Sequence, residues 1–162
     1  MNAIRKILVP TDFSAHAGEA FRVAQALAGP LNAEVVLFHV ARPPAVAAED
    51  GLFLSDLENP PPVNVWERFH ALQPDDPAIR VRHEVIVADR PDAGHVLDIL
   101  ERLGCELIVM GTHGHSWLKH LLFGTLTEQV VRRAHCPVLV VKAPAAHPVP
   151  KAPAQTEAAR AG

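Results

Sequence analysis

The chain has 162 residues and a formal net charge of −3, from 15 Lys+Arg and 18 Asp+Glu. A chain of this length accommodates one hydrophobic core. Aromatic residues make up 5% of the chain, and the sequence lacks the basic stripe and stacking platform typical of nucleic-acid binding. The longest apolar runs are far shorter than the roughly 18 residues that a membrane span needs. We therefore expect neither nucleic acid nor a membrane as a partner.

The first predicted strand covers residues 4–9 and ends at Pro10, which has no N–H to continue a ladder. Ser14 can cap a helix whose apolar residues fall on one face, and Pro30, after a glycine, is expected to stop it. Residues 34–40 form a second run that is too continuously apolar for a solvated face, which predicts a buried strand.

The periodicity disappears over residues 41–62, where prolines cluster and an irregular loop is predicted. An apolar stripe then predicts a helix over residues 63–73, and alternating residues predict a strand over 81–87. Pro91 suits the first turn of the next helix, and Gly104 is expected to end it.

A fourth strand is predicted over residues 106–110, followed by a glycine-containing segment over 111–124. A helix over 126–134 and a fifth strand over 138–142 follow, and the Ala/Pro-rich residues 143–162 are expected to be a disordered tail. Residues 1–142 would then be the folded domain.

Strands that alternate with helices indicate a doubly wound parallel α/β sheet with helices on both faces. In such sheets ligands bind beyond the carboxyl ends of the strands, where the strand order switches. A functional site is therefore expected after Val9, after Val40 and after Met110.

The segment after the fourth predicted strand carries the strongest signal for a ligand. Gly111 leaves the strand where a side chain would block a ligand, and Gly114 allows close backbone approach. Thr125 and Glu128 fit a capping box, and a helix N-terminus is a ready site for phosphate. The alternative is a capped helix after a flexible loop, in which the glycines serve only as turns.

The spacing of this segment, Gly, two residues, Gly, nine residues, Gly-Thr, resembles the ATP-binding motif of the universal stress protein family. The similarity runs from Ile4 to about Lys142 and includes the segments over residues 7–12 and 136–141. It implies a Rossmann-like fold, similar to the adenine nucleotide alpha hydrolases, with strand order 3-2-1-4-5. It also implies bound ATP, with Mg²⁺ or Mn²⁺ held through the phosphates.

The resemblance also implies a role for individual positions. Asp12 would hold nucleotide hydroxyls and the backbone at Val40 would meet the adenine edge. Taken by itself, Asp12 is better interpreted as a capping or turn carboxylate before a helix, but its position after the first strand favours the nucleotide role. The full set of positions that the family motif places at the nucleotide is Pro10, Thr11, Asp12, Val40, Gly111, Gly114, His115, Ser116, Gly124, Thr125, Leu126 and Thr127.

Two residues depart from the family pattern: His115 and Trp117 stand where the family often has a basic residue and a glycine. The departure implies weaker positive charge and added bulk beside the phosphates.

His113, His115 and His120 also permit a zinc interpretation, but no Cys or carboxylate is spaced to complete a tetrahedral set, which favours solvated loop histidines.

The resemblance further implies a homodimer through the edge strand Val138–Val141. Three functions compete: an ATP-binding signalling module of the stress response, a slow ATPase, and a nucleotide-independent scaffold or chaperone-like protein. No clear catalytic base lies in the phosphate loop, which favours the binding module over the enzyme.

The two cysteines, Cys105 and Cys136, form no CxxC or metal-ligand pattern, which together with the absence of a signal-peptide pattern predicts a cytoplasmic protein. Each precedes a predicted strand at the end of the sheet opposite the nucleotide. Buried free thiols are the favoured interpretation and a redox switch is the alternative.

Overall fold

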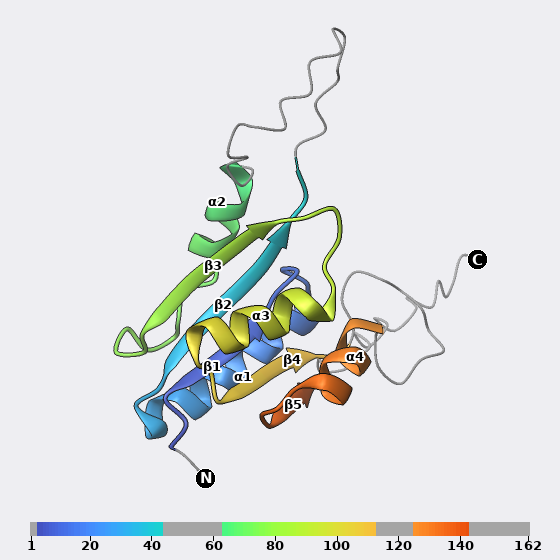
Figure 1. Cartoon of the computed structure of the whole chain (residues 1–162). Helices are drawn as coiled ribbons and strands as arrows, with labels where there is room; N and C mark the ends of the chain where they lie inside the picture. Colours follow the sequence, from blue (N-terminus) through green and yellow to red (C-terminus); the bar gives the residue numbers. More distant parts are fainter. Residues whose placement is uncertain (1–2, 44–62, 113–124, 143–162) are drawn as a thin grey trace, which may run out of the picture.

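The computed structural model describes residues 3–43, 63–112 and 125–142, and in these the chain forms one parallel sheet flanked by helices (Figure 1). The strands are β1 (Lys6–Pro10), β2 (Glu34–Ala41), β3 (Val81–Val87), β4 (Leu107–Gly111) and β5 (Val138–Val141). The helices are α1 (Ala15–Leu31), α2 (Val63–Ala71), α3 (Ala93–Leu103) and α4 (Thr125–Arg133).

The sheet has the order β3-β2-β1-β4-β5, which confirms the predicted order and the doubly wound class. The chain moves outward from β1 to β2 and β3, then crosses back to β4, so the order switches between β1 and β4. Pairing of β1 with β2 ends at Pro10 opposite Phe38, so β2 extends beyond β1 by the residues up to Ala41. The carboxyl end of β2 therefore projects past its neighbour, at the place where ligands bind in this class of sheet.

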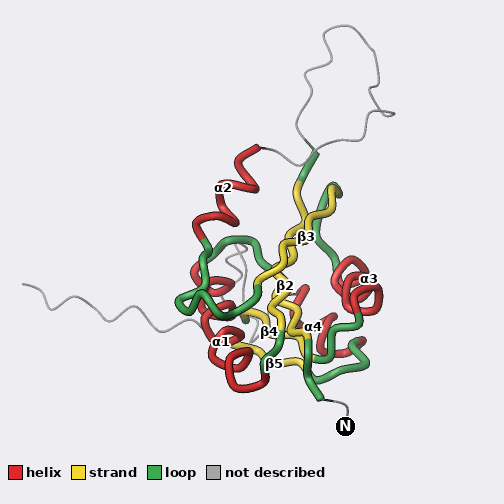
Figure 2. The backbone as a smooth tube through the Cα atoms, turned by 90° about the vertical axis from the view of Figure 1, so that its left-hand side faces the viewer, coloured by secondary structure: helices red, strands yellow, loops and turns green. Residues whose placement is uncertain are grey.

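Two apolar cores lie on opposite faces of the sheet. Figure 2 shows α1 and α2 on one side of the strands and α3 and α4 on the other. Ile7, Val9 and Phe69 belong to the core under α1 and α2, whereas Leu8 and Val130 belong to the core under α3 and α4. Successive residues of β1 enter different cores, because side chains alternate along a strand.

Helix α1 runs through Pro30 and ends at Leu31, so the prediction that Pro30 stops the helix is wrong. Pro30 lies in the last turn, where it removes one backbone donor from a helix that is already ending. Asn32 takes a left-handed conformation (φ 49°), and the Ala33 N–H donates to Ala28 O at 3.0 Å. These contacts close the helix two residues later than expected.

Helix α3 begins after Asp92, so Pro91 lies outside the helix and not in its first turn as predicted. Asp92 accepts the His95 N–H at 3.0 Å, and His95 Nδ1 returns a contact to the Asp92 N–H at 3.3 Å. This reciprocal cap satisfies two donors and fixes the start of the helix. Gly104 ends it with φ 63°, as predicted.

Other element bounds differ from prediction by one or two residues. Helix α2 ends at Ala71 and not at residue 73, and β4 begins at Leu107 and ends at Gly111. Strand β3 has the predicted bounds. The irregular loop is predicted over residues 41–62, but Ala41 belongs to β2. Residues 44–62 of that loop and the predicted tail over 143–162 lie outside the described residues.

Candidate functional site

The turn between β1 and α1 carries the first group of predicted site residues. Thr11 is buried, and its N–H donates to Phe38 O at 2.8 Å as the last rung between β1 and β2. Asp12 Oδ1 accepts the Ser14 N–H at 3.0 Å, and Ser14 caps α1 by accepting the Ala17 N–H at 3.3 Å. Asp12 thus lies at the carboxyl end of β1, as predicted, and its carboxylate also stabilises the turn that begins the helix.

The Val40 N–H and C=O point to the β1 side of β2, but β1 ends before it reaches Val40. In a parallel strand the N–H and C=O of one residue point to the same neighbour, and successive residues point to opposite neighbours. Phe38 O accepts from Thr11 on the β1 side, and Ala41 O accepts from Ala88 at 2.9 Å on the β3 side. Val40 therefore presents a donor and an acceptor toward the gap beyond the end of β1.

Gly111, at the end of β4, packs against the first turn of α1. A Cβ at this position would lie 2.9 Å from the His16 Cβ and 3.0 Å from the His16 backbone carbon and oxygen. The clearance that Gly111 provides therefore serves helix packing, which corrects the interpretation that a side chain here would block a ligand. Its position at the end of β4, beside the predicted site, is as expected.

Thr127 connects the start of α4 to the end of β4. Its side chain is 3% exposed, and its hydroxyl donates to Gly111 O at 3.0 Å. This bond places the amino end of α4 beside the carboxyl end of β4. The hydroxyl proton is used within the protein, so this buried side chain holds the two elements together.

The first residue of α4 is Thr125, so the proposed capping box, which needs Thr125 just before the helix, has the wrong register. Glu128 instead accepts from Arg132 Nε at 3.2 Å, one turn further along the exposed face. Thr125 is exposed at the helix start, and Leu126 packs against the core under α3 and α4. The helix N-terminus still faces the predicted side of the sheet.

Several predicted site residues lie outside the described residues. These are Gly114, His115, Ser116 and Gly124 of the proposed nucleotide set, together with His113, Trp117 and His120. Their roles stay predictions. Within the ranges that the structure describes, no group of three or more His, Cys, Asp or Glu side chains is arranged to hold a metal ion.

His39 lies beside the site and was not predicted. Its Nδ1–H donates to Thr11 O at 2.7 Å, since a carbonyl can only accept, and its ring lies 4.6 Å from that of Phe13. Burial lowers the pKa of His39; the Thr11 bond and Asp12 oppose this shift, and Arg68 adds to it. A polar residue near the end of an otherwise apolar strand was the available signal.

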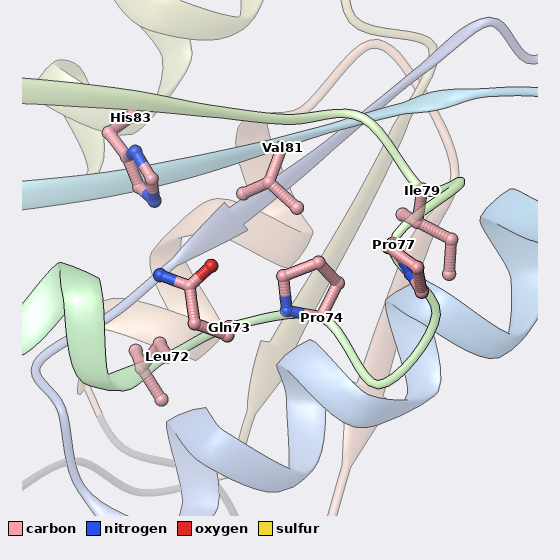
Figure 3. A pocket seen from close by; sticks show the side chains of 7 residues that line it. All are labelled: Leu72, Gln73, Pro74, Pro77, Ile79, Val81 and His83. Atoms are coloured by element: carbon pink, nitrogen blue, oxygen red, sulfur yellow. The ribbon is translucent and has the colours of Figure 1, made fainter.

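A groove of about 330 Å³ lies elsewhere, between β3 and the segment that connects α2 to β3 (Figure 3). Val81 and His83 line it from β3, and His83 Nε2 is buried with no hydrogen-bond partner among the described residues. Burial, with a smaller contribution from His70, lowers the pKa of His83. Val81 pairs with Val35 near the amino end of β2, so the groove is separate from the predicted nucleotide site.

The cysteines lie at the opposite end of the sheet, as predicted. Cys105 is buried and Cys136 is half-buried, and both pack in the core under α3 and α4. Burial raises the pKa of Cys105 to about 11 and also raises that of Cys136. Both thiols are therefore protonated at neutral pH, which agrees with the interpretation of buried free thiols.

Sequence similarity to the universal stress protein family extends over residues 3–142. The chain belongs to this family. Universal stress protein MJ0577 of Methanocaldococcus jannaschii is 31% identical over 155 residues, which cover 85% of this chain and 94% of the relative. Universal stress protein MJ0531 of the same organism is 29% identical over 157 residues, covering 88% and 85% respectively.

Solved structures of family members share the fold. The structure of MJ0577 gives a TM-score of 0.67 at 30% identity, covering 87% of this chain and 97% of that one. UspA from Lactobacillus plantarum gives 0.70 at 24% identity, covering 87% and 99%. A universal stress protein in complex with cAMP gives 0.64, and one from Archaeoglobus fulgidus in complex with dAMP gives 0.55, both at 18% identity. They cover 88% and 87% of this chain and the whole (100%) of their own.

No helix in the described part of the chain is both long and apolar enough to span a membrane.

Proposed function

We propose that this universal stress protein binds an adenine nucleotide, specifically ATP, beyond the carboxyl ends of β1, β2 and β4. The observation that carries the proposal is the peptide edge of Val40, which presents a donor and an acceptor beyond the end of β1, next to the switch point between β1 and β4. Adenine offers the complementary pair on its N1 and N6 edge. The cAMP and dAMP complexes of two proteins with this fold support the same ligand class.

Asp12 is the proposed partner of the ribose hydroxyls. Its Oδ1 already accepts the Ser14 N–H, and a carboxylate has further acceptor positions for hydroxyl donors. Thr125 begins α4, whose amino end offers backbone donors and a partial positive charge to the phosphate tail. Gly114, His115, Ser116 and Gly124 complete the proposed phosphate site, with Mg²⁺ or Mn²⁺ bridging the phosphates.

Nucleotide binding is proposed to regulate a cytoplasmic homodimer that signals during stress. Strand β5 is at the edge of the sheet, next to β4, and Leu139 is 39% exposed on it. An apolar edge strand with unpaired backbone groups is a ready surface for pairing with a second copy. Sedimentation at micromolar concentration tests the dimer, and a monomer with and without ATP would remove this part of the proposal.

The decisive experiment is calorimetric titration of the nucleotide-free protein with ATP and Mg²⁺. Wild type should bind, and Gly114→Ala should abolish binding. Asp12→Asn keeps the Oδ1 acceptor of the turn and removes the charge, so we expect affinity to fall about tenfold. Asp98→Asn makes the same charge change on the exposed face of α3 and should bind like wild type.

Absence of ATP binding by wild-type protein would refute the proposed function. Equal affinity of Asp12→Asn and Asp98→Asn would remove Asp12 from the site while leaving the nucleotide in place. Prolonged incubation with labelled ATP then separates a binding protein from a slow ATPase.

A further inference from the structure

The Val40 N–H and C=O, here called its peptide edge, are open because the side chains of His39 and Thr11 bind the two backbone groups that would otherwise pair with them. If the ladder between β1 and β2 continued for one more step, the Val40 N–H would donate to Thr11 O. The Phe13 N–H would then donate to Val40 O. Among the hydrogen bonds of the described residues, neither of these two is present.

Both diverted partners bind elsewhere at short distance. His39 Nδ1–H donates to Thr11 O at 2.7 Å, so the carbonyl that would receive the Val40 N–H is directed to the imidazole. The Phe13 N–H donates to Thr11 Oγ1 at 3.0 Å, so the donor that would reach Val40 O is occupied as well. The His39 imidazole and the Thr11 hydroxyl thus take the place of Val40 as hydrogen-bond partners of Thr11 O and the Phe13 N–H. The Val40 N–H and C=O are therefore not paired with these two groups.

The turn that makes this diversion possible is held by aromatic packing. Phe13 has φ 62°, a left-handed conformation that costs a non-glycine residue about 1–2 kcal/mol. Its ring lies 4.6 Å from that of His39 and 5.1 Å from that of Phe69, and the Arg68 guanidinium lies 4.3 Å from its centroid. His39 therefore makes a hydrogen bond and a ring contact with the same turn.

We propose that His39 and Thr11 are positioning residues that keep the Val40 peptide edge open for the adenine base. This role rests on the proposed function and deepens it, because it explains how the protein distinguishes adenine. The Val40 C=O accepts from the adenine N6 amine, and the Val40 N–H donates to N1. Hypoxanthine presents a carbonyl and an N–H at these positions, so the same peptide edge opposes it with like groups.

The test compares ATP with inosine triphosphate, ITP, which differ at this base edge and share ribose and phosphates. Wild type should prefer ATP. His39→Leu removes the donor to Thr11 O and leaves that carbonyl free to pair with the Val40 N–H. We expect ATP affinity to fall about threefold to tenfold, the equivalent of the one hydrogen bond that the Val40 N–H no longer makes to adenine, with ITP affinity nearly unchanged.

The matched control is His39→Asn, which keeps an N–H donor close to the position of Nδ1 and should retain the preference for ATP. Thr11→Val and Thr11→Ser form a second pair, since valine removes the acceptor of the Phe13 N–H and serine keeps it. This pair decides the question if His39→Leu fails to fold. A general loss of stability would weaken ATP and ITP together and would leave their ratio unchanged.

Amide hydrogen exchange of Val40, measured by NMR without nucleotide, gives a readout independent of binding. The Val40 amide should exchange at least about tenfold more slowly in His39→Leu than in wild type, because it gains Thr11 O as a partner. If wild type prefers ATP and His39→Leu keeps both that preference and the wild-type exchange rate, the positioning role is refuted and the proposed function stands. If wild type binds neither nucleotide, the proposed function itself fails, and with it the positioning role.

Discussion

Replacing Gly111 with alanine should destabilise the protein, because the first turn of α1 leaves no room for a side chain. The new Cβ would lie 2.9 Å from the His16 Cβ and 3.0 Å from the His16 backbone carbon and oxygen. Backbone atoms of a helix cannot rotate away as a flexible side chain does, so β4 or α1 must shift. Overpacking of this kind costs about 1–3 kcal/mol.

The shift also strains the contact between β4 and α4. Gly111 O accepts the Thr127 hydroxyl at 3.0 Å, and a displaced strand end lengthens this bond, which adds about 1 kcal/mol. The combined loss of about 2–4 kcal/mol corresponds to a Tm lower by about 5–15 °C for a domain of this size.

Urea unfolding followed by far-UV circular dichroism, at one protein concentration, measures the loss. Gly18→Ala is the matched control, because a Cβ at Gly18 in α1 meets no atom within 4 Å. Alanine there should stabilise the protein by up to about 1 kcal/mol. If Gly111→Ala proves as stable as Gly18→Ala and loses nucleotide binding, helix packing is not the reason for the glycine, and the original interpretation of ligand clearance is restored.

The remaining predictions concern pH, thiol reactivity and a helix end. Burial lowers the pKa of His39 and His83 below the ordinary value of 6.5, so the unfolded chain takes up more protons than the folded one as pH falls through that value. The stability contributed by neutral His39 and His83 is therefore full above about pH 6.5 and is lost toward lower pH. The urea concentration at the unfolding midpoint should decrease when the pH is lowered from about 7.5 to about 5.5, and it should decrease less in His83→Leu. A midpoint that increases would contradict the burial argument. Cys105, with a pKa of about 11, should react with a thiol reagent far more slowly in the folded protein than in urea. It should also react more slowly than the less buried Cys136. Rapid reaction of both thiols in the native state would show that the core opens. Gly104→Ala should cost about 1 kcal/mol in the same urea assay, because φ 63° is unfavourable for alanine although the site has open space; no loss would mean that the helix end rearranges freely.

The order of strands and helices could be predicted because each apolar run has the length and periodicity of one element. Bounds were harder to predict where a local cap decides them. Asn32 ends α1 after Pro30, and Asp92 starts α3 after Pro91, so in each case the capping residue overrides the nearby proline. A proline indicates that an element end is near, whereas the residue that satisfies the free backbone groups determines where it is.

The strand ends at which the described candidate residues lie could be predicted, but the contacts of these residues could not. The approach of His39 to Thr11, 28 residues apart, depends on the register between β1 and β2. The bond from Thr127 to Gly111 depends in the same way on how α4 sits against β4. Register is a property of the assembled sheet, so a motif read along the chain does not reveal which side chains meet across it.

The glycines of one motif need not share one physical cause. Gly111 is explained by the close approach of α1, an explanation that requires no ligand. The role of Gly114 at the nucleotide stays a prediction. Loss of ATP binding in Gly111→Ala is therefore evidence about the ligand only when stability is unchanged, whereas Gly114→Ala addresses the ligand directly. A motif match supports a binding site most strongly through those of its residues that the packing of the protein does not already explain.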